Sequence, residues 1–167
     1  MAIGAGGVDL GTLQNAGAAP KLIRASKTFT GAANLGATGV NELFTTTGAV
    51  LLDGFWVRCT SDMVDAVDGA VFTIGVTGAA LRLSDWSLID LDTLDAGDFV
   101  DTDTAATDGY GIDLVAAVTA GGMAVVDNLI MTISTQAITG GVLAFYVLYR
   151  PLSADGALSL GAGMVAI

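Results

Sequence analysis

Aspartate is the residue type in this 167-residue chain that most invites a chemical function. Nine aspartates fall between positions 85 and 113, and carboxylate oxygens are ligands that Ca²⁺ prefers. The EF-hand spacing is absent, because Ala105 follows Asp101 and Asp103 and the sixth position holds no glycine. We therefore assign no metal site and interpret the stretch as a solvated acidic loop. The only metal-ligand candidates within it are Asp90, Asp92, Asp95, Asp98, Asp101 and Asp103.

The chain has little equipment for catalysis near neutral pH. It contains no His, a single Glu (Glu42) and a single Cys (Cys59), whereas acid–base chemistry usually relies on His or on tuned Glu or Lys residues. No G-x-S-x-G, S-x-x-K or phosphate-binding loop occurs. Residues 161–166 match G-x-G-x-x-A but have no βαβ unit around them. The sequence predicts a protein that is not an enzyme and needs no cofactor.

Three aromatic residues are candidates for a ligand-binding surface. Trp86 and Tyr110 flank the acidic stretch, where they form a possible sugar-stacking face. The interpretation that we favour is that both pack under the long loop. Trp56 lies in an apolar run that Cys59 ends, and we expect both residues in the core. A lone cysteine cannot form an intrachain disulfide.

Charge restricts the partners. The net charge is −11 with only six basic residues, so we expect no nucleic-acid binding, which depends on Lys and Arg. Lys21, Arg24 and Lys27 fall within seven positions. They either dock the domain on an acidic partner or protect an edge strand from pairing with other chains. We leave both interpretations open.

The segments that carry these residues are predicted to be β-strands. Sixteen Asp stand against one Glu, and Asp favours turns whereas Glu favours helices. Apolar and polar residues alternate over 129–136, which is typical of a strand and not of a membrane-spanning helix. Residues 142–150 are apolar on both faces, which indicates cover by the opposite sheet and by a neighbouring subunit. Gly54 indicates a bulge or a bend in its strand. About eight such strands predict an all-β fold, a single β-sandwich of jelly-roll type.

The sequence divides into three parts. Residues 1–20 are rich in Gly and Ala and predict an extended N-terminal arm. Residues 21–153 predict the sandwich domain, and residues 154–167 predict a second tail, which is charge-free from Gly156 onwards. We expect no secretory signal, because the start of the chain has no basic region followed by a compact apolar one. Two apolar arms on one small domain indicate that both are buried against something else.

Several segments resemble small structural proteins of tailed bacteriophages. They are residues 28–36 (TFTGAANLG), 43–52 (LFTTTGAVLL), 94–101 (LDAGDFVD) and 145–152 (FYVLYRPL). The resemblance covers roughly residues 21–153 and consists of strand-and-turn texture without a catalytic signature. It implies a component of the virion, and in particular a capsid decoration (cement) protein, a class that is often a β-sandwich and frequently trimeric.

This resemblance sets the functional expectations. The protein would decorate and stabilise a capsid exterior after assembly in the host cytoplasm. Its partners would be the major capsid protein and its own copies, as a homotrimer, with no membrane. Lys21, Arg24 and Lys27 would contact the capsid. The alternatives are a receptor- or glycan-binding module of a head fibre or tail tip, which would use Trp86 and Tyr110, and a structural protein of the tail.

Overall fold

Strands are the regular elements of the chain, as its composition predicts. The computed structural model describes residues 18–67, 69–77, 82–85, 94–100 and 122–167, and every regular element in these ranges is a β-strand. The strands are β1 (Lys21–Thr28), β2 (Gly39–Thr47), β3 (Val50–Asp65), β4 (Val71–Val76), β5 (Arg82–Asp85), β6 (Phe99–Val100), β7 (Met123–Val125), β8 (Leu129–Ser134), β9 (Ile138–Pro151), β10 (Ala157–Leu160) and β11 (Met164–Ala166).

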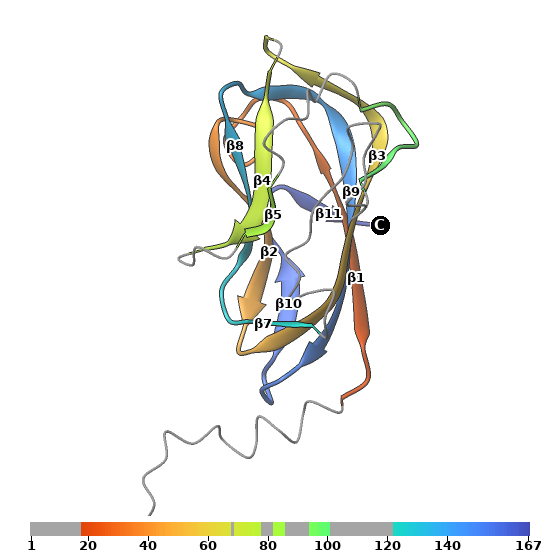
Figure 1. Ribbon diagram of the computed structural model, residues 1–167, viewed down its shortest axis with the longest axis vertical. Helices are drawn as coiled ribbons and strands as arrows, with labels where there is room; N and C mark the ends of the chain where they lie inside the picture. The colour runs from red at the N-terminus through yellow and green to blue at the C-terminus, as the bar shows by residue number, and fades with distance from the viewer. Residues whose placement is uncertain (1–17, 68, 78–81, 86–93, 101–121) are drawn as a thin grey trace, which may run out of the picture.

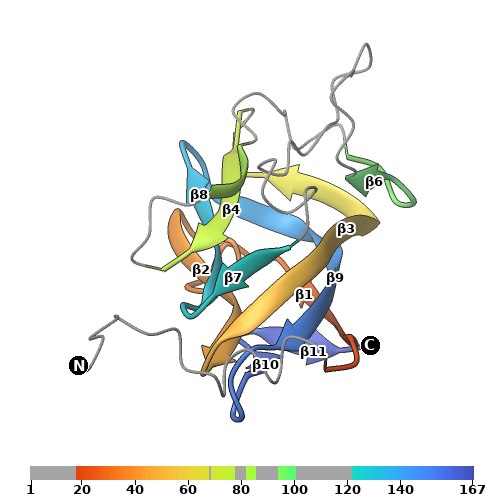
Figure 2. The ribbon, with the colours of Figure 1, turned by 60° about the horizontal axis from the view of Figure 1, so that its bottom comes forward.

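The strands form two antiparallel sheets that pack face to face (Figures 1 and 2). One sheet has the order β11-β1-β9-β3-β6, with β7 also pairing with β3, and the other has the order β10-β2-β8-β4-β5. The chain crosses between the sheets at each step from β1 to β4 and again from β7 to β9. The arrangement β1-β9-β3-β7 facing β2-β8-β4-β5 is the eight-strand order of a jelly roll. The expected fold is therefore confirmed.

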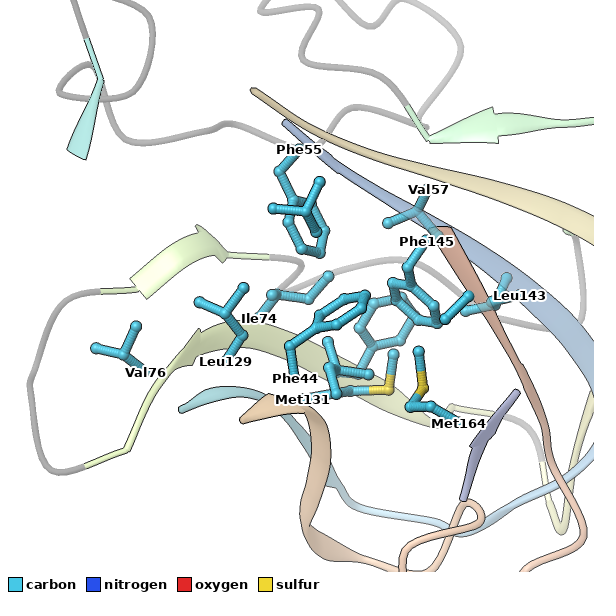
Figure 3. Packing of buried hydrophobic residues seen from close by; sticks show 14 of the residues in the cluster. Phe44, Phe55, Val57, Ile74, Val76, Leu129, Met131, Leu143, Phe145 and Met164 are labelled. Atoms are coloured by element: carbon cyan, nitrogen blue, oxygen red, sulfur yellow. The ribbon is translucent and has the colours of Figure 1, made fainter. Parts of the chain in front are cut away.

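The space between the sheets is filled by the inward residues of each strand. In β8, Leu129, Met131 and Ile133 are buried, as the alternation predicts. Side chains from both sheets meet in this layer (Figure 3). Among them, the rings of Phe55 and Phe145 pack edge to face with centroids 6.3 Å apart. The predicted irregularity at Gly54 is present as a register shift between Leu52 and Gly54.

The expectation of a C-terminal tail at residues 154–167 is wrong. Strand β10 pairs with β2, and β11 pairs with β1, so this segment adds one strand to each sheet. The physical reason is that Leu158 and Met164 point inward and are buried. Between the two strands the chain crosses at Gly161, where a Cβ atom would lie 2.8 Å from the backbone of Leu43. The segment closes one side of the sandwich.

The other expected arm is not tested. The N-terminal arm, residues 1–20, lies outside the described residues except for its last three. The acidic stretch is described in residues 94–100, together with the short strand β5.

Candidate interaction surface

The outward face of the first sheet carries large aromatic and apolar side chains. Register places Arg24 of β1 opposite Tyr146 of β9, and Tyr146 opposite Trp56 of β3. Residues that face each other across antiparallel strands share one side of the sheet. Leu148 lies in the next row along β9. We call the group Trp56, Tyr146 and Leu148 the aromatic face.

Trp56 was expected in the core, and this expectation is wrong. Its side chain is 40% exposed, because the alternation of β3 turns Phe55 and Val57 inward and Trp56 outward. The indole lies along its own strand over Gly54: a Cβ atom on that glycine would be 2.5 Å from Cη2 of Trp56. The absence of a side chain at Gly54 thus creates the place where the indole rests.

The outward face of the second sheet is different in kind. Register places Val40, Thr132 and Thr73 in one row, and Ser159 opposite Thr45. Short hydroxyl side chains dominate this face, which we call the threonine face. Its exposed apolar side chain is Val40, at 59%. The two broad surfaces of the sandwich therefore differ, and among the side chains that the structure describes, the outward-facing aromatic ones lie on the first.

Lys27 is not available to a partner, although the sequence grouped it with Lys21 and Arg24 as a capsid contact. It is fully buried, and its Nζ donates to the carbonyl oxygens of Glu42 at 2.8 Å and Ala162 at 2.9 Å. Burial lowers the pKa of the amine from 10.5 to about 8, while the nearby charge of Glu42 opposes this shift. Lys27 has a structural role between the two sheets.

The single glutamate belongs to the same structural cluster. The carboxylate of Glu42 accepts hydrogen bonds from Asn128 Nδ2 at 2.8 Å and from Thr45 Oγ1 at 3.3 Å. It also accepts one from the backbone N–H of Ala162 at 3.4 Å. Lys27 and Glu42 together tie β1 and β2 to the crossing between β10 and β11. These hydrogen bonds give Glu42 a structural role.

Lys21 and Arg24 remain exposed, at an edge of the first sheet. Strand β11 pairs with β1 only at Ala25–Lys27, and one backbone hydrogen bond of 3.5 Å runs from Ile167 N to Arg24 O. Among the described residues, no strand pairs with the first half of β1 on this side. Edge protection and docking on a partner both fit the exposed positions of these two residues.

The described part of the acidic stretch forms a turn. Asp98 Oδ2 accepts from the Asp95 N–H at 3.0 Å, and Asp62 Oδ1 accepts from the Ala96 N–H at 2.8 Å. Within the described ranges, no group of three or more His, Cys, Asp or Glu side chains is placed to hold a metal ion. Six predicted site residues lie outside the described residues: Trp86, Asp90, Asp92, Asp101, Asp103 and Tyr110.

Cys59 is buried in the core, as expected. Its Sγ lies 3.2 Å from the carbonyl oxygen of Ser61 and 3.5 Å from that of Leu94. Burial raises the pKa of the thiol, and the nearby aspartates raise it further, whereas the hydrogen bond to Ser61 acts in the opposite direction. These surroundings are those of a packing residue and not of a nucleophile.

The aromatic face is the feature that sequence reasoning missed. A signal for half of it was present, because residues 142–150 were expected to be covered on both sides, and Tyr146 and Leu148 form the outward side of that strand. The other half required knowledge of the β3 register, which brings Trp56 beside them.

Comparisons with protein-family models, curated proteins and solved structures found no match. Within the part of the chain that the structure describes, no helix has the length and apolar character needed to span a membrane. The fold places the chain among the jelly-roll β-sandwiches. The surfaces of the sandwich are the remaining guide to its function.

Proposed function

We propose that this protein is a structural virion protein that decorates and stabilises a bacteriophage capsid by binding between capsid subunits. The aromatic face is the docking surface. In this proposal the protein is assembled in the host cytoplasm, lies on the capsid exterior and acts as a trimer. Stabilisation comes from burial of apolar area between subunits and needs no chemical step.

The observation that carries the proposal is the contrast between the two faces. Trp and Tyr are among the residue types enriched where a few side chains supply most of the binding energy, and Trp56 and Tyr146 lie opposite each other on neighbouring strands. Among the described side chains, the threonine face has no Trp, Tyr or Arg. Trp56, which is 40% exposed, stands beside Tyr146 and Leu148 and not alone, and such grouping of large apolar side chains favours a binding surface.

Fold and resemblance agree with this proposal. Jelly rolls occur in viral capsid domains, but they also occur in lectins and enzymes, so the fold alone does not identify a function. The likeness of residues 28–36 and 145–152 to tailed-phage structural proteins favours the viral role. The test below also distinguishes the proposed role from the two alternatives, a glycan-binding module and a tail protein.

Replacing Trp56 and Tyr146 together with alanine is expected to weaken binding to phage heads by about 100-fold or more, because each is a candidate for a dominant contact. Heads of the encoding phage that lack this protein are mixed with it and sedimented, and the bound fraction is measured. The matched control replaces Thr73 and Thr132 on the threonine face with alanine, and we expect unchanged binding.

Three results would overturn the proposal. In the first, the unmodified protein fails to sediment with heads. In the second, the Trp56→Ala/Tyr146→Ala variant binds as tightly as the unmodified protein. In the third, the protein binds purified tails or a glycan array and not heads, which would favour one of the alternatives. Urea denaturation of both variants verifies that each is folded.

A further inference from the structure

The edge of the first sheet at β1 and β11 combines basic and apolar side chains. Lys21 and Arg24 are exposed there, and neither has an ion pair among the described residues. Three large apolar side chains beside them are also exposed: Leu22 at 54%, Val165 at 63% and Ile167 at 53%. We call these five residues the basic edge. Two of the six basic residues of a chain with net charge −11 are gathered here.

The opposite edge of the same sheet has a net charge of the other sign, because three aspartates outnumber the one arginine there, Arg58, which lies opposite Phe99 of β6. Residues 94–98 run beside β3, with backbone hydrogen bonds from Cys59 N to Asp98 O at 2.8 Å and from Met63 N to Leu94 O at 3.1 Å. Asp62, Asp95 and Asp98 are exposed along this edge. Val64, which is 51% exposed, lies among them. We call these four residues the acidic edge, and the strand order separates it from the basic edge by the width of the sheet (Figure 2).

We propose that the basic edge of one copy of this chain binds the acidic edge of a second copy. The two edges are complementary in charge, and each brings exposed apolar area to the contact. A contact between two basic edges would place Arg24 opposite Arg24, and a contact between two acidic edges would oppose carboxylates. The sheet therefore favours association from head to tail. This inference deepens the proposed function by naming the contact through which copies would form the trimer, and it does not depend on capsid binding.

Such a contact has a geometric consequence. Because the surfaces that meet are different, an open assembly keeps one unused edge at each end, and copies add until rotation closes a ring. The rotation axis of such a ring makes the aromatic faces of all copies equivalent. The aromatic face lies between the two edges and is not part of the contact.

The test uses charge exchange between the edges. Arg24→Glu alone, and Asp95→Lys with Asp98→Lys alone, are each expected to weaken association at least about tenfold, because like charges then face each other. Size-exclusion chromatography with light scattering measures the oligomer. In a mixture, the two variants are expected to bind each other and to form assemblies in which they alternate, because the new glutamate then faces the new lysines. A contact between two basic edges would instead be insensitive to the lysine substitutions alone, and a contact between two acidic edges would be insensitive to Arg24→Glu alone.

Controls separate local charge from net charge and from misfolding. Thr47→Glu with Ser159→Glu changes the net charge by the same amount as Arg24→Glu but on the threonine face, and we expect the oligomer to be unchanged. Melting followed by circular dichroism verifies the fold, and Arg24→Gln replaces Arg24→Glu if the latter unfolds. The proposal is overturned if the unmodified protein is monomeric at its highest soluble concentration, or if the charge changes and their mixture leave the oligomer unaffected.

Discussion

Replacing Lys27 with alanine is expected to lower the free energy of unfolding by about 3–5 kcal/mol. Two losses combine in this value. The long side chain is fully buried, so its removal leaves a cavity between the sheets. The carbonyl oxygens of Glu42 and Ala162 also lose their hydrogen bonds of 2.8 and 2.9 Å. Urea denaturation followed by circular dichroism measures the change.

Two variants divide this effect into its parts. Lys27→Met keeps most of the apolar volume and removes only the hydrogen bonds, so we expect a smaller loss of about 1–3 kcal/mol. Lys21→Ala changes an exposed lysine of the same strand, and we expect a change within about 0.5 kcal/mol. If Lys27→Ala proves no more damaging than Lys21→Ala, Lys27 does not tie the sheets together.

The same lysine predicts a dependence on pH. Its folded-state pKa of about 8 lies below the ordinary 10.5, so between these values the unfolded chain binds more protons than the native one. Its contribution to stability therefore rises with pH across this window. The neutral amine still has two N–H donors for its two carbonyl acceptors. We therefore compare the free energies of unfolding of the unmodified protein and of Lys27→Met as the pH is raised from about 8 to 10.5. The unmodified protein should gain stability relative to the variant over this range. A difference that stays constant with pH would contradict the prediction.

Sequence reasoning succeeded where information was local. The alternation of Leu129, Met131 and Ile133 needs only neighbouring residues, and it correctly predicts which face of β8 is buried. The scarcity of Glu beside abundant Asp likewise reflects local preference for turns over helices. These signals were enough to predict the all-β fold, and the number of strands favoured a jelly-roll sandwich, whereas the strand order comes from the structure.

The errors arose where the partner lies far away in sequence. Lys27 looked like a surface charge because its acceptors, Glu42 and Ala162, are 15 and 135 positions away. Trp56 looked like a core residue because only the register of β3 shows that it points outward over Gly54. The aromatic face could not be predicted for the same reason, since it is assembled from two strands that pair across about 90 residues.

The C-terminal segment shows how composition can mislead. Residues 154–167 are rich in Gly and Ala, which suggested a tail. Their two large inward residues, Leu158 and Met164, find cover only when the sandwich is assembled. The small residues between them are needed because Gly161 crosses tightly over Leu43. What looked like an arm for binding a neighbour is part of the domain itself.

A chain that ends at Asp155 is accordingly expected not to fold cooperatively. It loses the buried side chains of Leu158 and Met164, the pairing of β10 with β2 and of β11 with β1, and one of the two acceptors of Lys27. Each buried side chain contributes about 2–5 kcal/mol, and the total approaches the roughly 5–15 kcal/mol that stabilises a typical domain. Circular dichroism during a urea titration should show no sharp transition.

Adding the missing strands as a separate peptide tests the cause of this failure. A peptide of residues 156–167 is expected to restore the transition, and its midpoint should rise with peptide concentration, because the peptide binds only the folded sandwich. The control peptide carries Leu158→Asp and Met164→Asp and should have no effect, since charged groups cannot replace buried apolar ones. A truncated chain with the same urea midpoint as the full chain would mean that residues 156–167 are dispensable for folding. In that case they would again be available as the arm that the composition suggested.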